Sequence, residues 1–228
     1  MCILSYILTR VGFTITFSRD EVYNRTSTAP ELHNYKGQQL VFPKDNSSGD
    51  SWIGFNKTKS ILGCILNNTG KSPNEPSKSR GLHLINQLVS GNGNLNEKTL
   101  RHIAPFTQVF FHLQTKTIIQ IDWDGLSLKK QNISMYSPFL ICSNSLYDQK
   151  TQTELKTHFI NQISANTEEE NVSSSFHKRN LFYRNHPIYL KKGCDIQTLS
   201  ITKIVKNMSG FVLEYKDVLN RKTEILQL

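Results

Sequence analysis

Short runs of apolar and β-branched residues, separated by polar turns, recur along most of the chain. The first two runs cover residues 3–8 and 12–17, and Thr9-Arg10-Val11-Gly12 lies between them. Runs of this length are typical of strands, and a short turn between two of them predicts an antiparallel hairpin. Such a hairpin returns Arg19-Asp20-Glu21 to the start of the chain, beside Cys2.

Similar runs follow in both halves of the sequence. Expected strands cover residues 39–42, 51–55, 60–66, 108–113, 117–123, 139–142, 199–205, 211–216 and 224–226. Pro43 is expected to end the first of these strands, because proline cannot donate a hydrogen bond to a sheet. The segment 22–30, which contains Ala29-Pro30, is expected to be an extended loop.

Helical periodicity is confined to a few places. Ser79 is a suitable N-cap for a helix that begins at Arg80, and Gly91-Asn92-Gly93 ends that helix. A second helix is expected within residues 95–104. Residues 147–163 predict a longer amphipathic helix, because their apolar side chains recur on one helical face.

The balance of these elements predicts the fold class. Many strands joined by tight turns, with only two or three helices, favour antiparallel sheets with helices packed outside them. The polar segment 167–175 is expected to be a loop before the C-terminal strands. We therefore expect an α+β layered fold in a single domain spanning residues 1–228, a length that suits one large domain.

Composition describes a soluble globular protein. Of 228 residues, 37% are hydrophobic and 20% charged, and no apolar run approaches the roughly 20 residues that span a bilayer. The N-terminal stretch does not predict a signal peptide, because no basic region precedes it, Arg10 interrupts it and no small-residue cleavage site follows. We expect no transmembrane segment and a cytoplasmic location.

The net charge of +9 permits anionic partners. The basic residues are scattered, however, and the densest groups are the pairs Lys129-Lys130 and Lys191-Lys192. No helix-turn-helix, zinc finger or aromatic–basic RNA motif is present. A solvated basic surface is the simpler interpretation, and the expected partner is a small anionic or acyl molecule rather than nucleic acid.

The four cysteines do not form a recognisable metal or redox motif. None is part of a CxxC pair, and a reducing compartment leaves them as free thiols. Cys64 and Cys142 lie in apolar runs, which predicts buried core positions. None of the seven histidines is in a ligand-spaced pair, so no metal site is expected.

Several motifs in the first ninety residues occur together in a specific order. They are Met1-Cys2, Arg19-Asp20-Glu21, Asn24-Arg25-Thr26, Ala29-Pro30, the segment 49–54 with Trp52, and Ser79-Arg80-Gly81. In combination they closely resemble the NRDE family, also called the transport and Golgi organisation protein 2 family. The resemblance implies the four-layer αββα fold of N-terminal nucleophile hydrolases.

The resemblance also implies a reaction. The nearest functional analogues are the choloylglycine hydrolase and penicillin acylase group, in which an N-terminal cysteine attacks an amide. By position, Cys2 is the implied nucleophile after removal of Met1, and Arg19 and Asp20 support it. The α-amine, with a pKa of about 7.7–8, suits a proton acceptor for the thiol, whose free pKa is about 8.5.

Four further residues complete the predicted site. Asn67, at the end of its strand, looks like an oxyanion donor. Asn144, in Ser143-Asn144-Ser145, resembles the group's Thr-Asn motif and is implied to orient the α-amine or the substrate. Arg80 and Trp52 are expected to contact the ligand, because a positive pocket suits propionate or acyl-phosphate groups. Structural interpretations stay open: Cys2 as a small buried residue at the start of a strand, Arg19-Asp20-Glu21 as a solvated turn or a structural ion pair, and Asn67 and Asn144 as turn residues that end strands.

Two departures from the family pattern bear on function. Ser18 stands where the motif usually has asparagine, and Gln197 replaces an arginine that precedes the penultimate strand. Two functions therefore stay open. One is a Cys2-dependent hydrolase of non-peptide C–N bonds; the other is a non-catalytic protein that binds or traffics haem or a lipid. No cofactor is expected, and haem enters only the second function, as a bound ligand.

Overall fold

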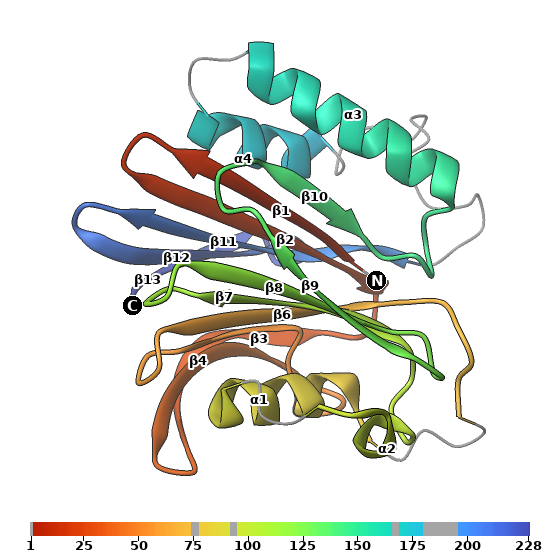
Figure 1. Cartoon of the computed structure of the whole chain (residues 1–228). Coiled ribbons are helices and arrows are strands. Elements are labelled where there is room, and N and C mark those ends of the chain that lie inside the picture. The colour runs from red at the N-terminus through yellow and green to blue at the C-terminus, as the bar shows by residue number, and fades with distance from the viewer. Residues whose placement is uncertain (1, 74–77, 92–94, 166–168, 180–195) are drawn as a thin grey trace. The chain divides into compact units, whose positions relative to one another are not determined.

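The computed structural model describes residues 2–73, 78–91, 95–165, 169–179 and 196–228. The chain divides into two units, Met1–Asn24 with Tyr136–Leu228, and Arg25–Met135. Each unit has its own antiparallel sheet and its own helices (Figure 1). The predicted α+β class is confirmed, and the predicted single domain stays a prediction.

The first unit contains a six-stranded sheet in the order β10-β1-β2-β11-β12-β13. Its strands are β1 (Cys2–Thr9), β2 (Gly12–Val22), β10 (Phe139–Cys142), β11 (Ile196–Asn207), β12 (Gly210–Asp217) and β13 (Lys222–Gln227). The N-terminal hairpin is as predicted, since β1 pairs with β2 along its whole length, from Cys2 opposite Arg19 to Thr9 opposite Gly12. One register shift, between Thr198 and Ser200, interrupts the pairing of β11 with β2.

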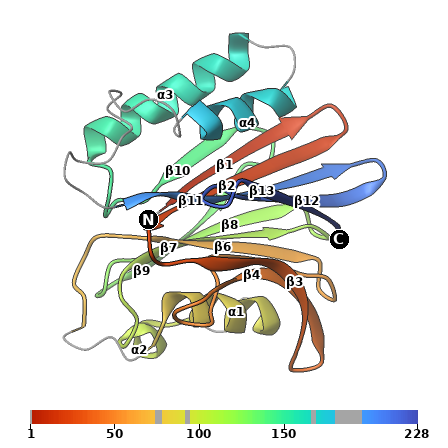
Figure 2. The same cartoon turned by 180° about the vertical axis from the view of Figure 1, so that it is seen from behind.

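Two helices cover one face of this sheet, α3 (Gln149–Ala165) and α4 (Glu169–Arg179), as Figure 2 shows from behind. Ile3 and Ile7 of β1 pack against Phe159 and Phe176 of the helices. The two phenyl rings meet edge to face, with centroids 5.2 Å apart. Because side chains alternate along a strand, the even-numbered residues of β1, including Cys2, leave the sheet on the other face.

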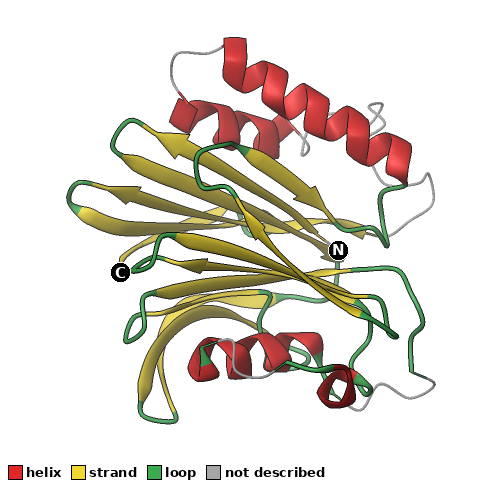
Figure 3. Cartoon of the chain, viewed as in Figure 1, coloured by secondary structure: helices red, strands yellow, loops and turns green. Residues whose placement is uncertain are grey.

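The second unit contains a seven-stranded sheet in sequential order, β3-β4-β5-β6-β7-β8-β9. Its strands are β3 (Ser27–Tyr35), β4 (Gln38–Asp45), β5 (Ile53–Asn56), β6 (Ile61–Asn67), β7 (Phe106–His112), β8 (Thr117–Trp123) and β9 (Leu128–Ile133). Its helices are α1 (Arg80–Ser90) and the short α2 (Glu97–Leu100), which Figure 3 shows in red.

Helix α1 forms as its sequence predicts. The Ser79 side chain accepts hydrogen bonds from the backbone N–H groups of Gly81 and Leu82, and Gly91 ends the helix in the left-handed region at φ 75°. The buried face of α1 packs on the sheet, with Leu84 and Phe110 in one apolar cluster. Local capping and one apolar stripe are therefore enough to define this helix.

Two predictions in the region of β3 and β4 are wrong. Much of the expected loop at residues 22–30 belongs to β2 and β3. Pro43 does not end its strand, because β4 continues to Asp45. Pro43 lies beyond the last β4–β5 pair, Leu40 with Asn56 and Val41 with Phe55, and beside the register shift between β3 and β4. Its missing N–H group therefore removes no regular ladder bond.

Three further expectations differ from the structure. The predicted helix at residues 95–104 shrinks to one turn, α2, capped by Asn96. The predicted loop at residues 167–175 overlaps helix α4, and β9 was not expected. The sequence pattern did not predict α4, because the buried face of this helix mixes apolar Phe176 with polar Ser173 and His177.

The predicted burial of Cys64 and Cys142 is confirmed. Within the described residues, no helix is both long and apolar enough to cross a bilayer.

Candidate functional site

Cys2 and Arg19 are direct partners across the N-terminal hairpin. Cys2 is the first residue of β1, and the register of the antiparallel pair places it opposite Arg19 in β2. Opposed residues project from the same face of a sheet, so the thiol and the guanidinium group leave the hairpin together. Both residues are buried, at 5% and 4% exposure. The sequence-level expectation that the hairpin brings Arg19 back to Cys2 is met.

Asp20 lies on the other face of β2, the face that the helices cover. Its carboxylate accepts a hydrogen bond from Thr198 Oγ1 at 2.7 Å and another from Tyr147 Oη at 3.3 Å. Tyr147 packs in the apolar cluster between the sheet and α3 and α4. Burial raises the pKa of Asp20 to about 6, and the two hydroxyl donors act against that rise.

The thiol of Cys2 is shifted toward its neutral form. Burial raises the pKa of Cys2, and the charge of Asp20 raises it further. Arg19 and a backbone hydrogen bond from Asp20 lower it, but burial is the largest effect. Arg19 thus acts in the direction expected from the sequence without deciding the outcome. Among the described residues, no group of three or more His, Cys, Asp or Glu side chains could hold a metal ion.

Asn144 lies on the loop that follows β10, close in the chain to a contact with Cys2. The backbone N–H of Ser143 donates to the carbonyl oxygen of Cys2 at 2.9 Å. Asn144 is exposed, and its Oδ1 accepts a hydrogen bond from Gln152 Nε2 at 2.7 Å. Cys2, Arg19, Asp20 and Asn144 therefore belong to one unit and lie around the start of β1.

The other three predicted site residues belong to the second unit. Trp52 accepts a backbone hydrogen bond from Ile65 of β6 at 2.9 Å, and Asn67 is the last residue of that strand. Arg80 Nη1 donates to the carbonyl oxygen of Pro105 at 3.2 Å, and the same oxygen accepts from the backbone N–H of Asn68. Trp52, Asn67 and Arg80 thus gather around the C-terminal end of β6.

The register of β6 places the Asn67 side chain on a definite face. Asn67 pairs with Phe106 of β7, and Phe106 packs in the cluster that includes Leu84 and Leu88 of α1. Since opposed residues share a face, the side chain of Asn67 leaves the sheet on the side that α1 covers. The oxyanion role expected for Asn67 stays a prediction.

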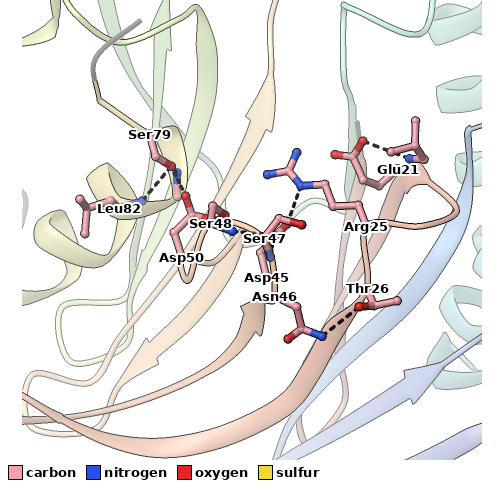
Figure 4. Close-up of polar contacts among 12 residues, drawn as sticks. Glu21, Arg25, Thr26, Asp45, Asn46, Ser47, Ser48, Asp50, Ser79 and Leu82 are labelled. Atoms are coloured by element: carbon pink, nitrogen blue, oxygen red, sulfur yellow. Dashed lines mark hydrogen bonds and ion pairs between the residues drawn. The ribbon is translucent and has the colours of Figure 1, made fainter.

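Motif residues that are not site residues build the framework of the second unit (Figure 4). Arg25 Nε pairs with Asp45 Oδ2 at 2.8 Å. Asp50 accepts hydrogen bonds from Ser48 Oγ, at 2.7 Å, and from the hydroxyl of Ser79, which also caps α1. These contacts join the β4–β5 turn to the start of α1. Arg25, Asp50 and Ser79, which belong to the motifs of the first ninety residues, therefore stabilise the fold of the second unit.

Ser18, a departure from the family pattern, belongs to a buried polar cluster behind the hairpin. The two ring nitrogens of His177 lie 2.6 Å from Ser18 Oγ and 2.8 Å from Ser5 Oγ. Ser173 contacts Ser5 and donates to Thr16 Oγ1. Burial lowers the pKa of His177 to about 3, so the imidazole is neutral. These hydrogen bonds connect α4 to both β1 and β2.

Sequence reasoning missed three residues that contact the site: Tyr147, Gln152 and Thr198. Tyr147 and Gln152 lie within the segment expected to be an amphipathic helix, where they count only as helical positions. Thr198 lies immediately before the β11 register shift. Their partners are up to 178 residues away in the sequence, and no local pattern signals such a contact. Gln197, the other departure from the family pattern, pairs with Glu21 in the β11–β2 ladder.

The family model described as Transport and Golgi organisation 2 matches residues 1–215. No curated protein matches the chain. Among solved structures, the chain resembles penicillin V acylase from Agrobacterium tumefaciens, with a TM-score of 0.59 and 9% identity. That likeness covers 100% of this chain and 86% of the acylase. At this identity it shows the fold alone, that of the N-terminal nucleophile hydrolases.

Proposed function

The chain belongs to the Transport and Golgi organisation 2 family, and from this premise we propose that it hydrolyses non-peptide amide C–N bonds with Cys2 as the nucleophile. The observation that carries the proposal is the pairing of Cys2 with Arg19 at the start of β1. A thiol on the first strand beside a buried cation is the arrangement that an N-terminal cysteine nucleophile needs.

The mechanism requires removal of Met1. The new α-amine of Cys2 then takes the proton of its own thiol, and the sulfur attacks the acyl carbon. The carbonyl becomes a tetrahedral oxyanion, the C–N bond breaks, and the leaving amine takes the proton from the α-ammonium group. Water then cleaves the thioester, which releases the acid and restores the thiol.

Residues around Cys2 have complementary roles in this scheme. Arg19 favours the thiolate, and Asn144 is a hydrogen-bond donor for the acyl oxygen. Asp20, which is buried behind the hairpin, holds the end of β2 through Thr198 and Tyr147. The ligand roles of Arg80 and Trp52 and the oxyanion role of Asn67 stay predictions from the resemblance.

The proposal is tested by covalent labelling of Cys2. Protein from its native host is first weighed by intact-mass spectrometry and then treated with a 4-nitrophenyl acyl ester or with penicillin V, the substrate named for the structural neighbour. We expect loss of Met1 and acylation of Cys2 alone. Cys2→Ala abolishes labelling, whereas Cys142→Ala, at another buried cysteine of the same unit, does not. Complete retention of Met1, or equal labelling of the cysteines, overturns the proposal.

A second candidate is a non-catalytic protein that binds or traffics haem or a lipid. The raised pKa of Cys2 favours it, because a protonated thiol is a weak nucleophile. Haem iron takes an axial histidine, among other ligands. Both ring nitrogens of His177 are engaged with serines, whereas His102 is exposed. Titration with haemin tests this candidate: it requires a Soret shift that His102→Ala weakens and Cys2→Ala leaves intact.

A further inference from the structure

Three polar residues of the second unit carry buried side-chain atoms that have no hydrogen-bond partner among the residues that the structure describes. These atoms are Nε2 of His83, Oε1 of Gln87, and both Nε2 and Oε1 of Gln108. Gln108 is fully buried, at 0% exposure, and His83 is at 9%. Native interiors contain few such atoms, because each gives up its hydrogen bonds with solvent and gains none in exchange. Four of them on three residues therefore require a physical explanation.

The register of β7 places the Gln108 side chain beneath α1. Gln108 pairs with Ile65 of β6 and with Ile121 of β8, and both partners belong to the apolar cluster that α1 covers. Opposed residues share a face of a sheet, so Gln108 projects into the same cluster. His83, on α1, has its ring centroid 5.1 Å from that of Phe106, which lies two residues before Gln108 in β7. Helix and strand therefore present these two polar side chains to the same part of the core.

His83 and Gln108 are close enough for one to affect the ionisation of the other. Burial is the largest effect on His83 and lowers its pKa to about 4, while Gln108 acts to raise this pKa and the charge of Lys78 lowers it further. The imidazole is therefore neutral near pH 7. Gln87 follows His83 by four positions, so the two side chains are neighbours on one side of α1. The four unpartnered atoms thus belong to one site between α1 and β7.

The chemistry of these atoms selects a neutral ligand that both donates and accepts hydrogen bonds. Whichever way its amide is turned, Gln108 presents one donor end and one acceptor end, and a neutral imidazole nitrogen is one or the other. An anion would be repelled by the amide oxygens. A cation would be repelled by the charge of Lys78, and none of the three residues is a carboxylate that could offset it. Water is the smallest ligand of the required kind, and buried water typically makes about three hydrogen bonds to polar groups.

We propose that His83, Gln87 and Gln108 form a buried hydration site, in which one or two ordered water molecules connect α1 to β7. The water supplies the hydrogen bonds that the protein itself does not provide to these side chains. The site thereby explains why polar residues stand among the apolar residues that join this helix to the sheet. The proposal is independent of the proposed function, because it involves neither Cys2 nor the residues around it.

One substitution distinguishes a hydrated site from a dry one by the sign of its effect on stability. Gln108→Met keeps the length of the side chain and removes both polar ends. In a hydrated site the water loses partners, so we expect the thermal unfolding midpoint of the full chain to fall by about 3–6 °C. In a dry site the same change removes two unpartnered atoms, and the midpoint rises. Gln131→Met, at an exposed position of β9 in the same sheet, is the matched control and should shift the midpoint by less than about 2 °C.

A crystal structure of the wild-type protein tests the site directly, and it does so even if Gln108→Met fails to fold. We expect ordered water density within about 3.2 Å of at least two of the four atoms. A direct hydrogen bond between His83 and Gln108 with no water beside them overturns the proposal, as does density near one atom or none. A rise in the unfolding midpoint of Gln108→Met overturns it as well.

Discussion

Tyr147 donates its hydroxyl hydrogen to Asp20 at 3.3 Å, although the two residues are 127 positions apart. The contact joins the loop before α3 to the end of β2, directly after the residue that faces Cys2. Burial, then the charge of Asp20, raises the pKa of Tyr147 well above its ordinary value. The Tyr147 phenol therefore keeps its proton and donates it to Asp20. The pKa of this carboxyl group is itself raised by burial.

Asp20 should make stability depend on pH in a direction unusual for a carboxylate. Its pKa is about 6 in the fold against 3.8 ordinarily, so folding favours the protonated form. The contribution is complete below the unfolded pKa and is lost as pH rises through about 6. The difference corresponds to about 3 kcal/mol. In urea unfolding between pH 4 and 7, wild type should lose up to about 3 kcal/mol relative to Asp20→Asn.

A companion variant checks the cause of this effect. Tyr147→Phe removes one donor to Asp20, so the pKa of the carboxylate should rise further, and the loss of stability should extend to higher pH. A carboxyl carbon titration by NMR measures that pKa directly. A pH dependence that is the same in wild type and Asp20→Asn would show that Asp20 ionises normally.

His177 should have the opposite effect. Burial lowers its pKa to about 3 from 6.5, so its contribution is present above pH 6.5 and is lost as pH falls through about 3. The difference corresponds to a contribution of about 5 kcal/mol. His177→Gln should therefore flatten the loss of stability between pH 6.5 and 4. It should also cost about 1–3 kcal/mol at pH 7, because the contacts with Ser5 and Ser18 are disturbed.

The same measurement on His102→Gln provides the control for His177. His102 is exposed, so its replacement should leave the acid limb of the stability profile unchanged. If His177→Gln and His102→Gln give the same profile as wild type, the buried imidazole does not govern acid stability.

Arg19 should promote the reactivity of the thiol that it faces. Its positive charge lowers the pKa of Cys2 against the effect of burial. Arg19→Met should therefore raise that pKa further and slow alkylation by iodoacetamide at pH 8 by about two- to fivefold. Arg10→Met, at the exposed turn of the same hairpin, should leave the rate unchanged. Equal rates for Arg19→Met and wild type would contradict an electrostatic role.

Gly81 should tolerate no side chain. A Cβ atom there would lie 2.5 Å from the carboxyl group of Asp50 and 2.6 Å from the carbonyl oxygen of Ser51. Since the Ser51 oxygen is backbone, Gly81→Ala must displace α1 or the β4–β5 turn, with a cost of about 1–3 kcal/mol. Chemical denaturation measures the loss. Ser90→Ala, at the exposed end of α1, is the control, and its cost should be within about 0.5 kcal/mol.

Much of the fold was readable from the sequence because its signals are local. The two apolar runs and the turn at Thr9–Gly12 predicted the hairpin, and the hairpin alone places Arg19 beside Cys2. Ser79 and Gly91 marked the ends of α1 correctly. Helix α4 was missed for the opposite reason. Its polar residues Ser173 and His177 find partners only on β1 and β2, more than 150 residues away.

The sequence by itself determined the antiparallel class, the N-terminal hairpin, and the meeting of Cys2 with Arg19, because neighbouring residues decide strand alternation, turns and caps. Only the tertiary structure decided that Asp20 faces Thr198 and Tyr147, that Gln152 donates a hydrogen bond to Asn144, and that burial raises the pKa of the Cys2 thiol. Those properties depend on which distant surfaces exclude water and supply donors. Desolvation and long-range hydrogen bonding act through space, so they first appear when the chain is folded.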